Sequence, residues 1–308
     1  MSAGWVAGSA RARLLLTRRL GETEVRRIAE AGSLEAAAQM LAGTRFAPVA
    51  ATTDLESADR AVATCLLIEL RLLSGWLPTG AGELIRSLAA WFELVNVEDR
   101  LAYLSGAPLA SPFALGSLNS AWPGVAAAQG MDDVRSALRR SAWGDPGAAT
   151  PQAIHLGLRL VWARRIARAA PEARSWAAGA LALLVARERF ISGLSADDLP
   201  VDRLAGELGR HWVQASTLDA FAAALPPRAS WAVDAVAENS ELWRAEAKWW
   251  RRVRSDAASL VRASRDGRAV VVGAVALLAA DAVRASAALA VATRSSNPAA
   301  RDAFDALV

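Results

Sequence analysis

The sequence predicts an all-α protein built from three similar helical units. Apolar residues make up 54% of the 308 residues, with alanine the most frequent, and the chain contains only 12 Pro and 21 Gly. Long stretches therefore run without a helix breaker, and clusters of β-branched or aromatic residues are few, so intrinsic propensity favours helix over strand. This apolar content is enough to bury a large core. The three-unit organisation is predicted from repeated patterns along the chain.

The first pattern is a short amphipathic helix. The stretch "SLEAAAQML" (33–41) recurs in related form as "GMDDVRSAL" (130–138) and "TLDAFAAAL" (217–225). The opening residue of each stretch is an acceptable helix N-cap, and an acid follows two positions later, where the helix dipole favours negative charge. Two apolar anchors lie seven residues apart in each copy, which is helical spacing. The anchor pairs are Leu34 and Leu41, which we expect to face inward, Met131 and Leu138, and Leu218 and Leu225.

The second pattern follows each short helix. "LVNVEDRLAYLSG" (94–106) aligns without gaps on "LALLVARERFISG" (181–193), and "LAADAVRASAA" (278–288) continues the series in part. Each unit is therefore predicted to hold a short capped helix followed by two longer ones. Loop-like stretches at 105–116 and 192–202 mark the boundaries. The predicted repeats are 1–108, 109–195 and 196–308, although alanine-rich helices also produce leucine pairs seven apart by accident.

The charge pattern does not indicate a nucleic-acid-binding protein. The net charge is only +4, and Lys248 is the sole lysine among 35 basic residues. The sequence pI of 10.3 therefore reflects arginines that do not titrate. Basic and acidic residues alternate, whereas a nucleic-acid footprint needs a dense stripe of one sign.

Three further segments bear on the compartment. Cys65 lies alone in an apolar run, which predicts a buried structural thiol in a reducing compartment. Arg11 and Arg13 interrupt the region where a signal peptide would be apolar. The most apolar segment, 269–280, is bounded by charged residues and is shorter than the roughly 20 residues of a bilayer span, which predicts a buried core helix. We expect a cytoplasmic protein.

Few residues suggest catalysis or a cofactor. His155 and His211 are the only histidines, and we expect each to be a partly buried core or interface residue rather than a metal ligand. The chain has no glycine-rich phosphate loop and no nucleophile elbow. We therefore expect a protein that is not an enzyme and that uses no cofactor.

Two acidic pairs leave an alternative open. Asp132 and Asp133 could belong to a divalent-metal site of a helical enzyme, but a position at a helix start accounts for them without a metal. Asp197 and Asp198 are explained in the same way, as loop and helix-entry residues.

Tryptophan and arginine provide the candidate interface. The chain has 12 Trp and one Tyr, and the stretch 241–256 holds three of these Trp. This stretch is either a partner-binding ridge, since Trp and Arg are favoured interface anchors, or a helix whose Trp243 and Trp250 face the core while Trp249 covers the rim. The candidate interface residues are Arg100, Arg187, Arg284, Trp249, Arg251 and Arg252. The first three could instead be ion-pair partners within their own units.

The opening of the chain resembles a known family. "SARARLLLTRRLGETEVRRIAEAGSLEAAAQMLAGTRFAP" is similar to the start of the C-type subunits of the bacterial and archaeal V/A-type rotary ATPases, which are homologous to the d-type subunits of the eukaryotic vacuolar proton pump. The step carried by Leu34, Leu41, Thr44 and Phe46 matches the family pattern, and "MDDVRSALRRSAWG" keeps most of it. The closing segment "VVVGAVALLAADAVRASAALAVATR" resembles the last long helix of the family, which returns beside the N-terminus.

The resemblance implies a structural role. Family members are all-α funnels of three similar units around a pseudo-three-fold axis. They sit on the cytoplasmic end of the proteolipid rotor ring, and their central socket receives the axle formed by the D and F subunits. They transmit torque between the head that makes or hydrolyses ATP and the ring that moves protons or sodium ions, and membrane contact is indirect through the ring. The alternative is a helical-repeat interaction scaffold unrelated to ATPases.

Overall fold

The computed structural model describes residues 2–234, 236, 238–294 and 297–308. These residues form α-helices and short 3-10 helices joined by loops, and no strand occurs among them. The prediction of an all-α protein is confirmed.

The chain divides into two compact units. The first contains residues 1–81 and 246–308, and the second contains residues 82–245. The N-terminal and C-terminal parts of the chain therefore share one unit. This division groups the chain by contacts and does not follow the predicted repeats 1–108, 109–195 and 196–308, which remain a prediction.

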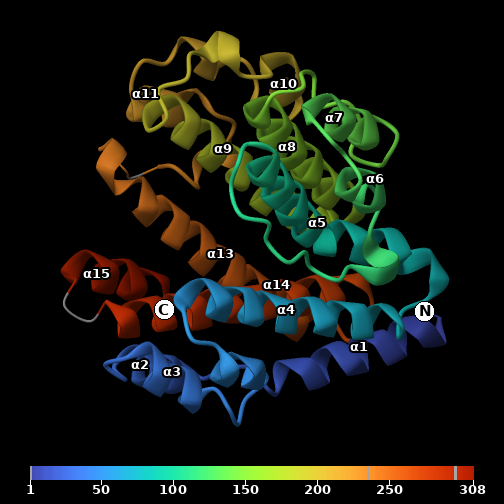
Figure 1. Ribbon diagram of the computed structural model, residues 1–308, viewed down its shortest axis with the longest axis vertical. Helices are drawn as coiled ribbons and strands as arrows, with labels where there is room; N and C mark the ends of the chain where they lie inside the picture. The colour runs from blue at the N-terminus through green and yellow to red at the C-terminus, as the bar shows by residue number, and fades with distance from the viewer. Residues whose placement is uncertain (1, 235, 237, 295–296) are drawn as a thin grey trace. The chain divides into compact units, whose positions relative to one another are not determined.

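The first unit is organised around its last long helix. Helix α14 (Arg268–Thr293) contacts α1, α2, α3, α4 and α15, and Figure 1 shows it running alongside α4 and α1. Four consecutive residues, 270–273, are all buried, so the helix is covered on every side. The other helices of this unit are α1 (Ala3–Leu16), α2 (Glu22–Ala29), α3 (Leu34–Met40), α4 (Leu55–Ser74), α15 (Pro298–Leu307) and all but the first residues of α13 (Leu242–Ala263).

The helix that contains the apolar segment 269–280 is longer than the sequence analysis predicts. The apolar segment 269–280 ends at Asp281, but the helix continues to Thr293 and reaches 26 residues. It is therefore long and apolar enough to cross a membrane, and within the described ranges it alone passes this test. In the structure 72% of its most apolar window is buried within the protein. The helix passes through Asp281 because that carboxylate is paired inside the unit.

Gly273 lets two helices of the first unit approach closely. A Cβ atom at this position would lie 2.7 Å from the Ala257 carbonyl oxygen and 2.9 Å from Val261 Cγ2, both on α13. Real Cβ atoms do not make such short contacts, so the crossing of α13 and α14 requires glycine here.

The second unit packs its short helices on three long ones. Helix α8 contacts both α5 and α9, while α6 packs on α5. The core where α5 to α8 meet is lined by Leu94, Val97, Leu138, Trp143 and Ile154, each at most 2% exposed. The helices are α5 (Gly82–Leu104), α6 (Trp122–Ala126), α7 (Met131–Arg139), α8 (Pro151–Ala169), α9 (Arg174–Phe190), α10 (Val201–Leu208), α11 (Leu218–Ala224) and α12 (Pro227–Ser230).

The three short helices begin where the sequence predicts. Ser33, Gly130 and Thr217 are the N-caps of α3, α7 and α11. The Ser33 and Thr217 hydroxyls accept the backbone N–H of the residue three positions on, at 3.1 and 3.2 Å. The second anchors are buried, while Leu34 and Met131 are half-buried, and Met131 packs against the core of the second unit.

Candidate functional site

A buried carboxylate on α14 holds the first unit together. Asp281 accepts the backbone N–H of Leu20, just before α2, at 3.1 Å, and pairs with Arg45 Nη1 at 3.1 Å. Arg45 lies beyond α3 and also pairs with Glu69 of α4. The side chains of Arg45 and Asp281 are each 1% exposed. We call these four residues the first clamp, because they join α14 to the segments before α2 and after α3 and to α4.

The acids of the first clamp have shifted pKa values. Burial raises the pKa of Asp281 above its ordinary value, and attraction to Arg45 only partly offsets this. Burial likewise raises the pKa of Glu69, again against Arg45. Desolvation therefore outweighs ion pairing for both carboxylates.

A second buried carboxylate joins several segments of the second unit. Glu93 of α5 is 1% exposed. It accepts the backbone N–H groups of Ser120, Ala121 and Trp122, at the start of α6, at 2.6 to 2.8 Å. It also accepts the Trp143 indole N–H at 2.7 Å and the Ser120 hydroxyl at 2.7 Å. We call these five residues the second clamp, in which every donor is neutral.

The turn after the short helix is also shared. The Thr44 hydroxyl donates to the Leu41 carbonyl at 2.8 Å and accepts the Phe46 N–H at 3.1 Å. In the second unit the Ser141 hydroxyl donates to Leu138 at 2.8 Å and accepts the Trp143 N–H at 3.1 Å. Both turns bury the aromatic ring that follows. The residues that the sequence matched between these two places therefore make the same hydrogen bonds.

The three arginines at matched positions have different surroundings. Arg100 is half-buried, donates to the Ala128 carbonyl and lies 4.9 Å from the Tyr103 ring centroid. Arg187 is exposed and interacts within the chain. Arg284 is only 6% exposed. Packing around α14 encloses most of Arg284, so this residue does not offer a protein-binding surface of the kind predicted for the axle or the ring.

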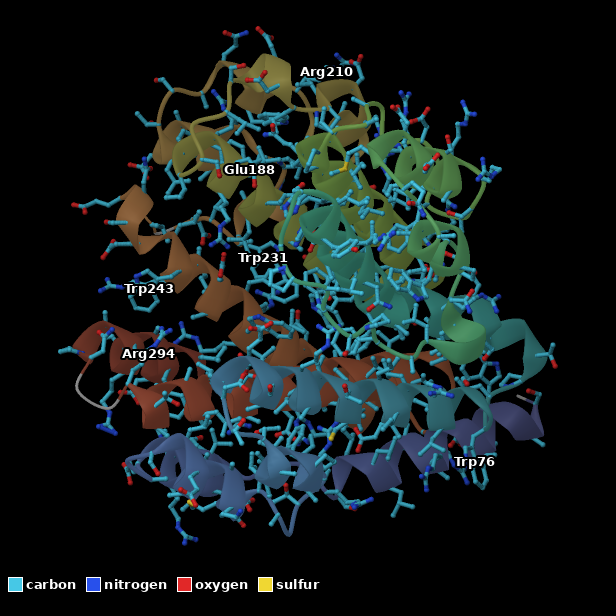
Figure 2. All side chains as sticks on the ribbon, in the orientation of Figure 1. Trp76, Glu188, Arg210, Trp231, Trp243 and Arg294 are labelled. Atoms are coloured by element: carbon cyan, nitrogen blue, oxygen red, sulfur yellow. The ribbon has the colours of Figure 1, made fainter. Side chains whose placement is uncertain are left out.

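The ridge on α13 is partly exposed. Trp243, Trp249 and Trp250 are half-buried, while Arg251 and Arg252 are exposed. Leu242, Ala245, Val253 and Ala257 are buried residues of this helix, and the equal half-burial of the three Trp does not decide between a partner-binding ridge and a core-facing helix. The Trp249 and Trp250 rings meet edge to face at 4.9 Å between centroids. Figure 2 shows Trp243 near the start of the helix.

Several large apolar side chains are exposed on α1 and α4, which contact each other in the first unit. Ile68 and Leu72 of α4 are 46% and 50% exposed, and Leu14 of α1 is 54% exposed. Trp76, in the segment after α4, is 52% exposed and is labelled beside α1 in Figure 2. Exposed apolar side chains on adjacent segments are candidates for an interaction surface. We call these four residues the apolar face.

The histidines lie in unlike settings. His155 of α8 is partly buried, and its Nδ1 lies 2.7 Å from Glu98 Oε1 of α5. Burial acts to raise the pKa of Glu98, but hydrogen bonds from His155 and Arg159 outweigh it and lower the pKa. His211 is exposed, so the prediction of a partly buried residue is wrong there.

The acidic pairs serve as helix-start residues. Asp132 and Asp133 lie in the first turn of α7, and Asp133 accepts the Gln129 N–H at 3.0 Å. Asp198 forms a capping box with Ser195. In the part of the chain that the structure describes, no group of three or more His, Cys, Asp or Glu side chains could hold a metal ion.

The thiol of Cys65 is buried. The residue is 7% exposed, and burial raises the pKa of the thiol. A buried thiol with a raised pKa is a poor nucleophile, as the sequence interpretation expects.

The sequence interpretation missed both clamps. Glu93 lies in "AWFELVNV" and Asp281 in "LLAADAVR", where a single acid interrupts an apolar helical run. A lone acid on the buried side of a helix needs donors, because burying an unpaired charge is costly. The lone acids could be recognised in the sequence, but the groups that donate hydrogen bonds to them could not.

No protein-family model matches the chain, and no curated protein matches it. The resemblance to the rotary-ATPase family therefore remains a prediction from the sequence.

Proposed function

We propose that this protein is a non-catalytic central-stalk adapter of a V/A-type rotary ATPase. In this role it couples the axle of D and F subunits to the proteolipid rotor ring during proton or sodium transport. It would be a peripheral protein at the cytoplasmic face of the membrane, in contact with lipid only through the ring. Its three predicted repeats would surround a pseudo-three-fold axis and form the socket for the axle.

The main support for this proposal is the order of helices, which recurs three times along the chain. A short helix precedes two long ones three times: α3 before α4 and α5, α7 before α8 and α9, and α11, followed by the one-turn α12, before α13 and α14. The second long helix then contacts short helices of the following predicted repeat, α5 with α6 and α9 with α10 and α11. The last, α14, contacts α2 and α3 of the first repeat. A cyclic order of contacts is what a three-fold body requires.

The interior also suits a load-bearing part. Buried alanine and leucine dominate the long helices, and close packing transmits strain because such interiors are hard to compress. The two clamps fix short helices to long ones with charged hydrogen bonds, which are stronger than neutral ones.

The proposal is tested by co-purification. The full-length protein, tagged and mixed with D and F subunits and with detergent-solubilised proteolipid ring, is expected to retain at least one of them and to hydrolyse no ATP alone. Retention of none of these partners contradicts the proposal.

The candidate contacts can be tested in the same assay. We expect Ile68→Asp with Leu72→Asp, on the apolar face, to reduce capture of one partner. Leu109→Asp is the matched control, because Leu109 is 64% exposed and lies in the second unit. Arg251→Glu probes the α13 ridge. Equal capture by all variants would remove both surfaces from the proposal.

The alternative, an interaction scaffold unrelated to ATPases, predicts a different envelope. A scaffold forms an open superhelix, whereas the adapter forms a closed three-part body. Small-angle scattering of the purified protein distinguishes the two, and an extended envelope would favour the scaffold.

A further inference from the structure

Three arginines of the first unit lie on segments that meet in the neighbourhood of α14. Arg284 lies one turn after Asp281 on α14. The bond from the Leu20 N–H to Asp281 brings the preceding residue, Arg19, to the same part of α14. Arg254 of α13 donates from Nη2 to the Val308 carbonyl oxygen at the end of α15, which packs on α14. We call Arg19, Arg254 and Arg284 the arginine cluster.

Two of these guanidinium groups have buried donors without acceptors. The Nε atoms of Arg284 and Arg19 are buried and have no hydrogen-bond partner among the described residues. Arg284 is only 6% exposed, so solvent reaches little of the side chain. Buried donors are almost always paired, because each unpaired donor costs free energy.

The carboxylates nearby do not provide the missing acceptors. Asp281 lies 4.0 Å from Arg284 Nη1, beyond hydrogen-bond distance, and already serves Arg45 and the Leu20 N–H. Glu22 attracts both Arg254 and Arg284, but its side chain is 60% exposed and accepts from Arg26. The cluster therefore keeps an excess of positive charge.

The arginines also repel one another. Burial lowers the pKa of Arg284, and the neighbouring charges of Arg254 and Arg19 lower it further. Burial lowers the pKa of Arg254, with Arg19 and Arg251 acting in the same direction. Positive charges that repel one another, with donors unfilled, suit a bound anion that the chain itself does not provide.

We propose that the arginine cluster is a binding site for a phosphoryl oxyanion. A phosphoryl group offers several strong acceptor oxygens, and guanidinium groups match it with paired N–H donors. The oxygens would accept from Arg284 Nε and Arg19 Nε and neutralise the repulsion with Arg254. This site does not rest on the proposed adapter function. The phosphoryl group can come from a free phosphate compound or from a lipid headgroup.

Thermal unfolding in matched ionic strength tests the site. Inorganic phosphate and pyrophosphate are each compared with chloride, and titration calorimetry gives the Kd. A ligand that binds only the folded state raises the unfolding midpoint. We expect Arg284→Met to weaken binding about tenfold or more, since one charged hydrogen bond has that worth. In chloride the variant should unfold no earlier than the native chain, because it removes a buried charge that Arg254 and Arg19 repel and whose ion pair with Asp281 is long, at 4.0 Å.

Arg165→Met is the matched control. Arg165 of α8 is 8% exposed and also has unpartnered Nε and Nη1 atoms, but it pairs with Glu83 in the second unit. We expect this variant to keep the response to phosphate. A conservative Arg284→Lys variant should keep part of the binding.

A vesicle assay separates the two sources. If vesicles with phosphatidylglycerol sediment the native chain but not Arg284→Met, and phosphatidylcholine vesicles sediment neither, the phosphoryl group belongs to a lipid. If free phosphate or pyrophosphate binds and the vesicles do not, the source is a soluble compound. The proposal is overturned if no probe binds, or if Arg284→Met binds as well as Arg165→Met.

Discussion

The two clamps perform the same task with different chemistry. In each, a carboxylate on a long helix accepts backbone N–H groups near the start of a short helix, one in the first clamp and three in the second. The same carboxylate also binds a side chain just beyond the next short helix. The first clamp uses Arg45 against two acids, Glu69 and Asp281. The second surrounds Glu93 with neutral donors only. The first clamp therefore depends on charge balance and the second on the number of hydrogen bonds, so matched substitutions should separate them.

The largest effect is expected for Arg45→Met. The substitution leaves Glu69 and Asp281 buried without their cation, which costs about 3 to 5 kcal/mol of unfolding free energy. Urea unfolding followed by circular dichroism measures the loss. Arg210→Met removes an exposed ion pair to Asp202 and should change stability by less than about 0.5 kcal/mol. A similar small change for Arg45→Met would show that the first clamp does not depend on its charge balance.

Glu93→Ala should come next. It leaves three backbone N–H groups and the Trp143 indole without an acceptor, for a loss of about 2 to 4 kcal/mol. Glu93→Gln keeps one acceptor oxygen and should recover part of this loss. Urea unfolding of both variants gives the ratio. Equal stability of the two would mean that hydrogen-bond number does not govern the second clamp.

Glycine contacts offer a third comparison of the units. Gly273→Ala forces the α13 backbone away, at about 1 to 3 kcal/mol. In the second unit, a Cβ at Gly157 would lie 3.0 Å from Pro146 Cα and Cβ, which is tight but less severe. The gain in helix propensity, about 1 kcal/mol, should leave Gly157→Ala near neutral. Thermal melts of the two variants should therefore differ clearly, and equal midpoints would contradict this interpretation of the α13 crossing.

The shared turn should respond equally in both units. Thr44→Val and Ser141→Ala each remove one hydroxyl that donates to a carbonyl and accepts an N–H, with a loss of about 1 kcal/mol. Chemical unfolding of the two variants tests whether the turns are energetically equivalent. A loss at one turn alone would argue against a common repeat.

The smallest effect concerns acid pH. The hydrogen bonds from Arg135 and the Gly147 N–H lower the pKa of Asp145 from 3.8 to about 2. The unfolded chain therefore binds this proton first, so the stabilisation is present above about pH 4 and is lost as the pH falls towards 2. Asp145→Asn should unfold earlier than the native chain at pH 5, with the difference fading by pH 2. The raised pKa values of Glu69 and Asp281 act in the opposite sense, since their contribution weakens as the pH rises from about 4.

Local chemistry made much of the fold predictable. The N-caps Ser33 and Thr217 bond to atoms only three residues away, so a short window of sequence contains the whole interaction. The turns at Thr44 and Ser141 are equally local. For the same reason the acidic pair at 132–133 is correctly interpreted as a helix start.

The clamps could not be predicted in the same way. The partners Arg45 and Asp281 are 236 residues apart, and only packing decides that they meet. The same limit explains Arg284, which shares a sequence pattern with Arg100 and Arg187 but lies in the interior. A sequence pattern predicts which residues share one face of a helix, whereas the residues that pack against that face depend on the rest of the chain.

The order of synthesis delays completion of the first clamp. Arg45 and Leu20 leave the ribosome long before Asp281, whereas every residue of the second clamp has been made by Trp143. At about 5 to 20 residues per second, the N-terminal segment waits on the order of 10 to 50 seconds for its carboxylate. The segment translated first is therefore among the last to acquire its buried partner, and a ribosome that stops before residue 281 releases a chain whose Arg45 lacks one of its two acids.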